Sequence, residues 1–193
     1  LEQMTVTDAE VEAYFDEHAA EYQENGLEKT DERYVDVRHI LIQPESAAGD
    51  GTYTDAEWSA AEKKANEVLS EWLAGDHTEE SFADLAKTYS TDPGSASNGG
   101  LYEGVYVGQM MPEFENWCFD ASRKVGDYGI VKTSYGYHIM YYVDSELAWF
   151  VAAETDMMAE KGNSFLEQIL EKNPAEIDYA AIQIGSVNVS SGS

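Results

Sequence analysis

The spacing of apolar and polar residues divides this chain into alternating extended and helical segments. A strand is expected at 33–42. It includes most of "VRHILIQ" (37–43), in which alternate side chains would share one face. The segment "YGIVKTSYGYHIMYYVDSE" (128–146) predicts two strands joined by a tight turn at Tyr135 and Gly136. A further short strand is expected around 103–107.

Helical periodicity fills the region between the first strand and the last two. A long amphipathic helix is expected to end near Gly75, and a shorter helix follows it. "MPEFENWCFD" (111–120) predicts a third, short helix. A strand, three helices and two neighbouring strands indicate an α+β unit in which helices cover an antiparallel sheet. The apolar stripes of the first two helices comprise Trp58, Ala61, Ala65, Val68, Leu69 and Trp72, and then Phe82, Leu85, Ala86 and Tyr89.

Helical patterns also flank this unit at both ends. Thr7 and Glu10 form a capping box at the start of an N-terminal helix, which "ENGLEKTDE" (24–32) closes. Beyond Glu146 a helix is expected to run to about Lys172, with a break or kink near Gly162, and to stop at Pro174. The apolar stripes of the two arms are Val11, Tyr14, Phe15, His18 and Tyr22, and Phe165, Leu166, Ile169 and Leu170.

These patterns divide the chain into an N-terminal helical arm (1–30), a central α+β unit (33–146) and a C-terminal helical arm (147–193). The segment "IDYAAIQIGSVNV" (177–189) favours a final strand in the last part. Each arm must bury its stripe on the other arm, on the central unit or on a second copy of the chain, which would make a homodimer.

Charge restricts the partners of this protein. The chain carries 38 acidic and 11 basic residues, a formal net charge of −27. Such a surface repels nucleic acid, phosphorylated peptides and anionic lipid, whereas basic or neutral polypeptides and metal cations remain acceptable partners. The charge could equally serve solubility alone.

Localisation signals are missing from the sequence. No apolar stretch approaches the roughly 20 residues that cross a bilayer. The chain begins with Leu1 and shows no signal-peptide pattern, so we interpret it as a mature or trimmed piece whose targeting segment is not included. Cys118 is the single cysteine, which allows no intrachain disulfide.

Two histidines lie in the middle of predicted strands. His39 shares a face with Val37 and Leu41, and His138 shares a face with Met140 and Tyr142. A single mid-strand histidine is more often a core residue with local partners. Two of them on sheet strands could meet, each fixing the tautomer and orientation of the other.

Two loops add candidate chemistry near these strands. "YSTDPGSASNGG" (89–100) places Asp92 at the head of a small-residue loop whose backbone could approach a ligand, although an Asx-type turn without chemistry explains it as well. "GQMMPEF" (108–114) carries Met110, Met111 and Phe114, which are either core residues or the lining of a pocket for a small apolar ring.

Four segments in this order resemble the successive signatures of the parvulin (rotamase, PpiC-type) peptidyl-prolyl isomerases. They are "RHILI", "FADLAKTYSTDPGSASNGG", "GQMMPEF" and "GIVKTSYGYHIMYYVDSE", and together they span about 33–146. The flanking helices are similar to the arms of secreted bacterial foldases of the PrsA type and periplasmic chaperones of the SurA type. This resemblance implies a parvulin-like four-stranded antiparallel sheet and an extracytoplasmic protein, either secreted or anchored at the bacterial cell surface, with any membrane anchor outside this chain.

The resemblance also implies a role for individual residues. His39 and His138 match the family's paired histidines, Asp92 matches a position held by Cys or Asp, and Thr133 matches a hydroxyl bonded near the histidines. The implied proline-binding residues are Tyr102, Met110, Met111 and Phe114.

The sequence departs from the family pattern at two places. The usual "DLGWF" run is replaced at 101–105 by "LYEGV", where Tyr102 stands at a position that more often holds Leu. The loop after the first strand, "PESAAGDGTYTDAE" (44–57), lacks the basic cluster of phospho-specific parvulins. Phosphopeptide binding is therefore not expected.

The implied activity is cis/trans isomerisation of X–Pro bonds in unfolded or proline-containing polypeptides. Rotation of this amide makes and breaks no bond, so neither cofactor nor metal is required, and a covalent role for Asp92 is not needed. Two alternatives remain open: a holdase chaperone whose parvulin domain is catalytically weak or inactive, and an acidic cation-binding module of the cell envelope.

Overall fold

The computed structural model describes residues 5–46, 49 and 52–173. These residues form two compact units by their contacts: one comprises 19–151, and the other combines the described parts of 1–18 and 152–193. The division into 1–30, 33–146 and 147–193 stays a prediction.

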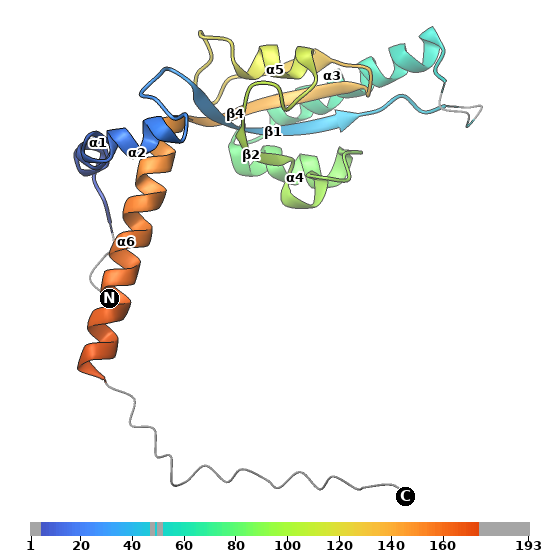
Figure 1. Ribbon diagram of the computed structural model, residues 1–193. Helices are drawn as coiled ribbons and strands as arrows, with labels where there is room; N and C mark the ends of the chain where they lie inside the picture. Colours follow the sequence, from blue (N-terminus) through green and yellow to red (C-terminus); the bar gives the residue numbers. More distant parts are fainter. Residues whose placement is uncertain (1–4, 47–48, 50–51, 174–193) are drawn as a thin grey trace, which may run out of the picture. The chain divides into compact units, whose positions relative to one another are not determined.

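Unit 19–151 is an α+β structure built on one sheet. Among the described residues, four antiparallel strands pair in the order β2-β1-β4-β3, and Figure 1 shows them between α5 and α4. The strands are β1 (Arg33–Ile42), β2 (Leu101–Val105), β3 (Tyr128–Lys132) and β4 (Tyr137–Leu147). The helices of this unit are α2 (Ala19–Glu24), α3 (Asp55–Ala74), α4 (Glu79–Tyr89), a 3₁₀ turn (Ala96–Asn98) and α5 (Pro112–Cys118).

Alternation along β1 and β4 gives the sheet two different cores. Ile40 and Ile139 face α3 and α4, where Val68, Trp72 and Phe82 complete an apolar layer. The opposite face packs on α5 and carries the second cluster. That second cluster comprises Val35, Val37, Val105, Phe114, Cys118, Val131, Met140 and Tyr142.

Local signals in the sequence place most of the helix ends. Thr54 caps α3 through a capping box with Glu57, and Gly75 follows its last residue. Thr78 caps α4 in the same way with Ser81. The prediction of these helices and of the sheet strands is confirmed, with the short strand at 101–105 instead of 103–107.

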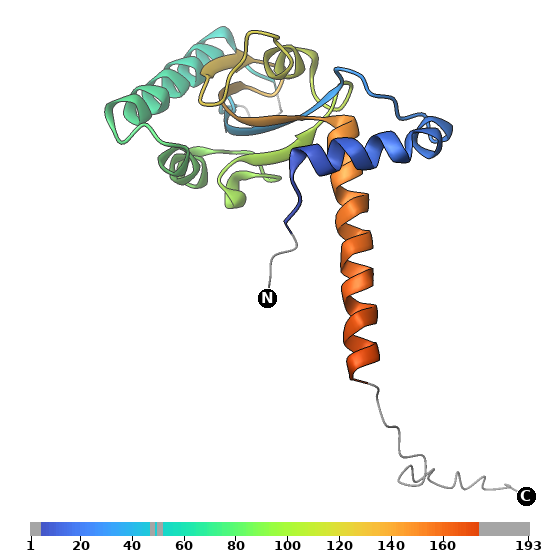
Figure 2. The same ribbon diagram turned by 90° about the vertical axis from the view of Figure 1, so that its left-hand side faces the viewer.

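The two terminal helices differ from expectation in their continuity. The N-terminal segment divides at His18, whose Nδ1 lies 2.8 Å from the Tyr14 carbonyl, so that α1 (Asp8–Glu17) ends before α2 begins. The break expected near Gly162 is wrong, because α6 (Ala148–Lys172) runs through this position, as Figure 2 shows. Glycine weakens a helix by about 1 kcal/mol but keeps its backbone N–H, so the helix continues. Pro174 and the strand expected at 177–189 lie outside the described residues.

The second unit joins α1 to the part of α6 beyond Val151. Val11 and Phe15 of α1 are buried, as are Ala153 and Met157 of α6. The Lys161 ammonium lies 3.5 Å from the Glu10 carboxylate.

Candidate active site

A pocket of about 400 Å³ opens on the sheet face that packs on α5. All eight residues predicted from the sequence line it: His39, Asp92, Tyr102, Met110, Met111, Phe114, Thr133 and His138. Four others that the sequence did not single out, Leu41, Gln43, Pro93 and Tyr135, complete the lining.

The pairing of β1 with β4 brings the two histidines together. His39 lies opposite Met140 and His138 lies opposite Leu41, so the two imidazoles occupy diagonal positions on one face. Both side chains are buried, and their Nδ1 atoms are 3.1 Å apart. A hydrogen bond from the His39 N–H to the Gly100 carbonyl (2.8 Å) fixes the backbone beneath them.

Asp92 reaches the histidines because its loop is fastened to β1. The backbone N–H and the hydroxyl of Thr91 both donate to the Leu41 carbonyl, at 2.9 and 3.0 Å. The next residue therefore extends over the sheet, with Asp92 Oδ2 3.1 Å from His39 Nε2. The Ser95 N–H and hydroxyl, three residues further on, also donate to Asp92 Oδ2.

Thr133 ends the hydrogen-bonded chain on the other side. Its Oγ1 accepts from the Tyr135 N–H (3.1 Å) and lies 2.9 Å from His138 Nε2. With Asp92 ionised, His39 Nε2–H donates to its Oδ2, while the bond between the two Nδ1 atoms and the bond between His138 Nε2 and Thr133 Oγ1 can each run in either direction. We assign the proton on His39 Nε2 from its carboxylate partner.

The protonation states of the two ends follow from their surroundings. Hydrogen bonds, that from His39 first, hold the pKa of Asp92 well below its usual range, although burial opposes them. Burial, and then the charge of His39, lowers the pKa of His138 to about 4. At neutral pH the site therefore contains a carboxylate anion and a neutral His138.

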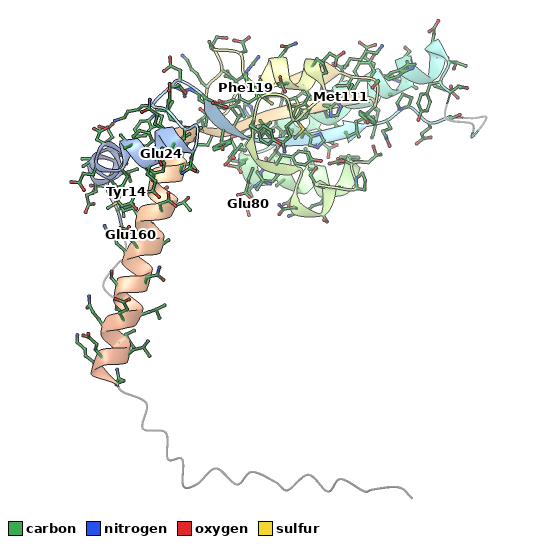
Figure 3. All side chains as sticks on the ribbon, viewed as in Figure 1. Tyr14, Glu24, Glu80, Met111, Phe119 and Glu160 are labelled. Carbon is green, nitrogen blue, oxygen red and sulfur yellow. The ribbon has the colours of Figure 1, made fainter. Side chains whose placement is uncertain are left out.

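The opposite wall of the pocket is apolar. Phe114 of α5 is buried and presents its ring edge-on to both imidazoles, with centroids 5.5 Å from His39 and 5.4 Å from His138. Met110 and Met111 are half-buried, and Met111 lies at the start of α5 (Figure 3). The pocket thus joins a small apolar chamber to a polar chain that includes the Asp92 carboxylate.

The pocket lining has no fixed positive charge, and the described residues contain no metal-binding cluster. No Lys or Arg belongs to the residues that line the pocket. Within 5–46, 49 and 52–173, no group of three or more His, Cys, Asp or Glu side chains is placed to hold a metal ion. In the same part of the chain, no helix is both long and apolar enough to cross a membrane.

The sequence missed Ser95, which is fully buried and bonded to both Asp92 and His39. The signal that could have found it is its spacing, because an Asp commonly accepts from groups two or three residues further along in a turn. Tyr135 and Gln43 have no comparable signal, since a turn residue and a residue after a strand become pocket residues only through the tertiary fold.

The family model described as the PPIC-type PPIase domain matches residues 22–146, well over half of the chain. The chain belongs to this family of peptidyl-prolyl isomerases. The match includes every one of the eight predicted site residues.

Foldases are among the relatives of this PPIC-type chain. Foldase protein PrsA 1 of Listeria monocytogenes is 31% identical over 140 residues, which are 72% of this chain and 36% of the relative. Foldase protein PrsA of Halalkalibacterium halodurans is 29% identical over 181 residues, 92% of this chain and 44% of the relative. The chain thus spans less than half the length of these relatives.

Similarity to a solved structure is lower. PrsA from Bacillus subtilis is 25% identical, with a TM-score of 0.45, over 91% of this chain and 58% of that structure. The chain is similar to these proteins in sequence, and its fold class rests on its own sheet and helices.

Proposed function

We propose that this chain catalyses cis/trans isomerisation of X–Pro peptide bonds as part of a longer foldase. The observation that carries this proposal is the pocket in which Phe114, Met110 and Met111 face the bonded chain of Asp92, His39 and His138. Membership of the PPIC-type family supports it.

The two walls of the pocket suit the two needs of amide rotation. The barrier is about 18–20 kcal/mol because the C–N bond has partial double-bond character. Tyr102, Met110, Met111 and Phe114 hold the pyrrolidine ring, while the polar wall favours the twisted amide, whose charge distribution differs from the planar one. Only interactions that strengthen in the twisted state accelerate rotation.

In this proposal His39, Asp92, His138 and Thr133 supply the polar wall. Asp92 acts without forming a covalent bond, because its Oδ2 faces donors from His39, Ser95 and Tyr102 that reduce its nucleophilicity. Thr133 orients His138 through the hydrogen bond between its Oγ1 and His138 Nε2.

The substrates we propose are unfolded or proline-containing polypeptides with neutral or basic residues before the proline. Asp92 is the charged residue among those lining the pocket, and the chain has a net charge of −27. A phosphate or a nucleic acid would meet repulsion without a compensating cation. We also propose an extracytoplasmic location, with any membrane anchor outside this chain, on the resemblance to secreted bacterial foldases.

A peptide series tests the activity and its selectivity together. Isomerisation of peptides X–Pro with X as Lys, Ala, Glu or phosphoserine is measured with the wild type and with two variants, Asp92→Ala and Asp84→Ala. Asp84 is an exposed carboxylate on α4 paired with Lys87, and it serves as a matched control. We expect catalysis that falls in the order Lys, Ala, Glu, phosphoserine, with differences that shrink as salt is raised.

Comparing Asp92→Ala with Asp84→Ala separates a role of Asp92 in catalysis from the general effect of removing one negative charge. Asp92→Ala should reduce kcat/KM by about tenfold or more, the size expected for hydrogen bonds to a charged group, whereas Asp84→Ala should match the wild type. A wild-type rate equal to the uncatalysed rate would refute the isomerase and favour the holdase alternative, to which the departure at 101–105 points. A preference for Glu or phosphoserine would refute the proposed selectivity alone.

A further inference from the structure

Tyr102 makes two contacts with the polar wall of the pocket. Its hydroxyl donates to Asp92 Oδ2 at 3.0 Å, and its ring stacks on His39 with centroids 5.2 Å apart and planes inclined by 24°. It lies on β2, the edge strand, and so approaches the Asp92–His39 pair from the side away from His138. Leucine, the more usual residue at this position in the resemblance, has no group that could make the first contact.

The loop leaves room for the Tyr102 hydroxyl. A Cβ atom at Gly94 would lie 3.0 Å from this hydroxyl and 3.7 Å from Asp92 Oδ2. Any larger residue at position 94 would therefore crowd the bond between them. Gly94 and Tyr102 form a matched pair, in which a missing side chain in the loop admits a hydroxyl from β2.

The hydroxyl adds one donor to an oxygen that already has donors. Asp92 Oδ2 faces the Ser95 N–H, the Ser95 hydroxyl and His39 Nε2 as well as Tyr102. Unlike the Ser95 groups, which belong to the same loop as Asp92, Tyr102 ties the carboxylate to the sheet. Burial, and then the bond to Asp92, raises the pKa of Tyr102, so its proton stays in place at neutral pH.

We infer that Tyr102 is a positioning residue of this site: its hydroxyl holds the Asp92 carboxylate and its ring holds the His39 imidazole, so that the two remain aligned while a peptide occupies the pocket. This inference rests on the proposed isomerase function and deepens it. It also gives a structural role to Tyr102, one of the residues by which 101–105 departs from the family pattern.

The central test is a double-mutant cycle in the full chain with Tyr102→Phe and Asp92→Ala. Tyr102→Phe keeps the ring and removes only the hydroxyl, and Tyr106→Phe, on the exposed loop after β2 and outside the pocket lining, is the matched control. Turnover and peptide affinity are measured separately by exchange NMR on an Ala–Pro peptide.

We expect Tyr102→Phe to lower turnover by about fivefold to tenfold while peptide affinity changes less than twofold, because one hydrogen bond to a charged group is lost and the apolar wall is kept. In the Asp92→Ala background the same substitution should change turnover by less than about twofold, since the groups act as one unit. Tyr106→Phe should match the wild type. Independent, multiplicative losses, or a Tyr102→Phe variant with wild-type turnover, would overturn the inference.

A second readout decides the inference without relying on catalysis. The alkaline ultraviolet titration of the wild type minus that of Tyr102→Phe isolates the Tyr102 phenol, and the same difference is taken in the Asp92→Ala background. We expect the midpoint to lie above 10 in the wild type and to fall when Asp92 is removed. An unchanged midpoint would overturn the bond to Asp92, whereas a wild type without isomerase activity but with this shift would refute only the proposed function.

Discussion

Asp92 and His138 belong to one hydrogen-bonded chain, yet their surroundings act on their charges in opposite ways. Asp92 keeps its negative charge because donors converge on Oδ2. His138 is held neutral because it is buried and because a charged His39 would repel its proton. The chain of bonds between them therefore has a carboxylate at the loop and, at neutral pH, a neutral imidazole beside Thr133.

The depressed pKa of His138 predicts a loss of stability in acid. Its folded pKa is about 4 and its ordinary value is 6.5, so between these limits the unfolded chain binds more protons. The free energy of unfolding should therefore fall by about 3 kcal/mol, through this residue, as the pH drops from 7 to 4. The variant His138→Gln has no imidazole to titrate. In urea unfolding at pH 7, 5.5 and 4, the free energy of unfolding of the wild type minus that of the variant should therefore decline by that amount.

Thr133→Val provides the comparison for this measurement. It removes the hydroxyl bonded to His138 Nε2 but leaves the titrating imidazole, so it should retain the acid-dependent decline of the wild type. A difference between wild type and His138→Gln that stays constant from pH 7 to 4 would show that His138 protonates equally in both states.

The loop between α4 and β2 is the element that brings Asp92 to the sheet. It is fastened at both ends: Thr91 donates to the Leu41 carbonyl, and the Gly100 carbonyl accepts from the His39 N–H. Arg38 donates to the carbonyl oxygens of Asn98 and Gly99 near the second attachment. The loop is therefore held against β1 by hydrogen bonds, and its geometry sets the distance from Asp92 to His39.

Gly100 permits the closest approach of this loop to β1. Its φ is +74°, and a Cβ atom there would lie 2.1 Å from the His39 carbonyl oxygen. Gly100→Ala should lower the free energy of unfolding by about 2 kcal/mol or more, because strain adds to a backbone clash, and should reduce isomerase activity by displacing the loop.

Gly104→Ala is the matched control for Gly100→Ala. Its φ is +65°, but nothing lies within 4 Å of the position where its Cβ would be. We expect a loss of about 1 kcal/mol from backbone strain alone and unchanged activity. Equal losses for the two variants in urea unfolding would show that the close approach at Gly100 has no energetic consequence.

The helices and strands of this unit could be predicted from the sequence, but the contacts between them could be predicted only in part. Period-two alternation put His39 and His138 each on one strand face, and the capping residues Thr54 and Thr78 marked helix starts. The diagonal placement of the histidines depends on pairing β1 with β4, about 100 residues apart along the chain, which no local pattern encodes. The burial of Ser95 likewise depends on where the folded loop lies.

At the scale of the whole molecule, the compact unit that carries the site includes residues on both sides of 33–146, the range predicted for the central unit. The compact unit runs over 19–151, and Tyr22, Ala148 and Trp149 are buried within it. The Ala148 N–H donates to the Glu32 carbonyl, and the Lys29 ammonium lies 4.5 Å from the centre of the Trp149 ring. The sequence does not mark the end of this compact unit, because α6 runs as one helix across Val151.

These contacts predict that fragment 19–151 is more stable than fragment 33–146. The shorter fragment lacks Tyr22, Lys29 and Trp149 and loses the cover that they provide. We expect 19–151 to unfold cooperatively with full isomerase activity on short peptides, and 33–146 to unfold at a urea concentration well below it. Removing α1 and most of α6 should at the same time abolish suppression of aggregation of an unfolded client.

The reason for the last expectation is the exposed apolar surface on α6. Phe165, Leu166, Ile169 and Leu170 are between 40% and 65% exposed among the residues that the structure describes. A full chain with Leu166 and Leu170 both changed to Ser should therefore retain the isomerase rate and lose protection of the client, while Glu167→Gln, on the same helix, should retain both. A fragment 19–151 that protects the client as well as the full chain would assign the holding of clients to the isomerase unit itself. Equal stability of the two fragments would support the predicted range 33–146.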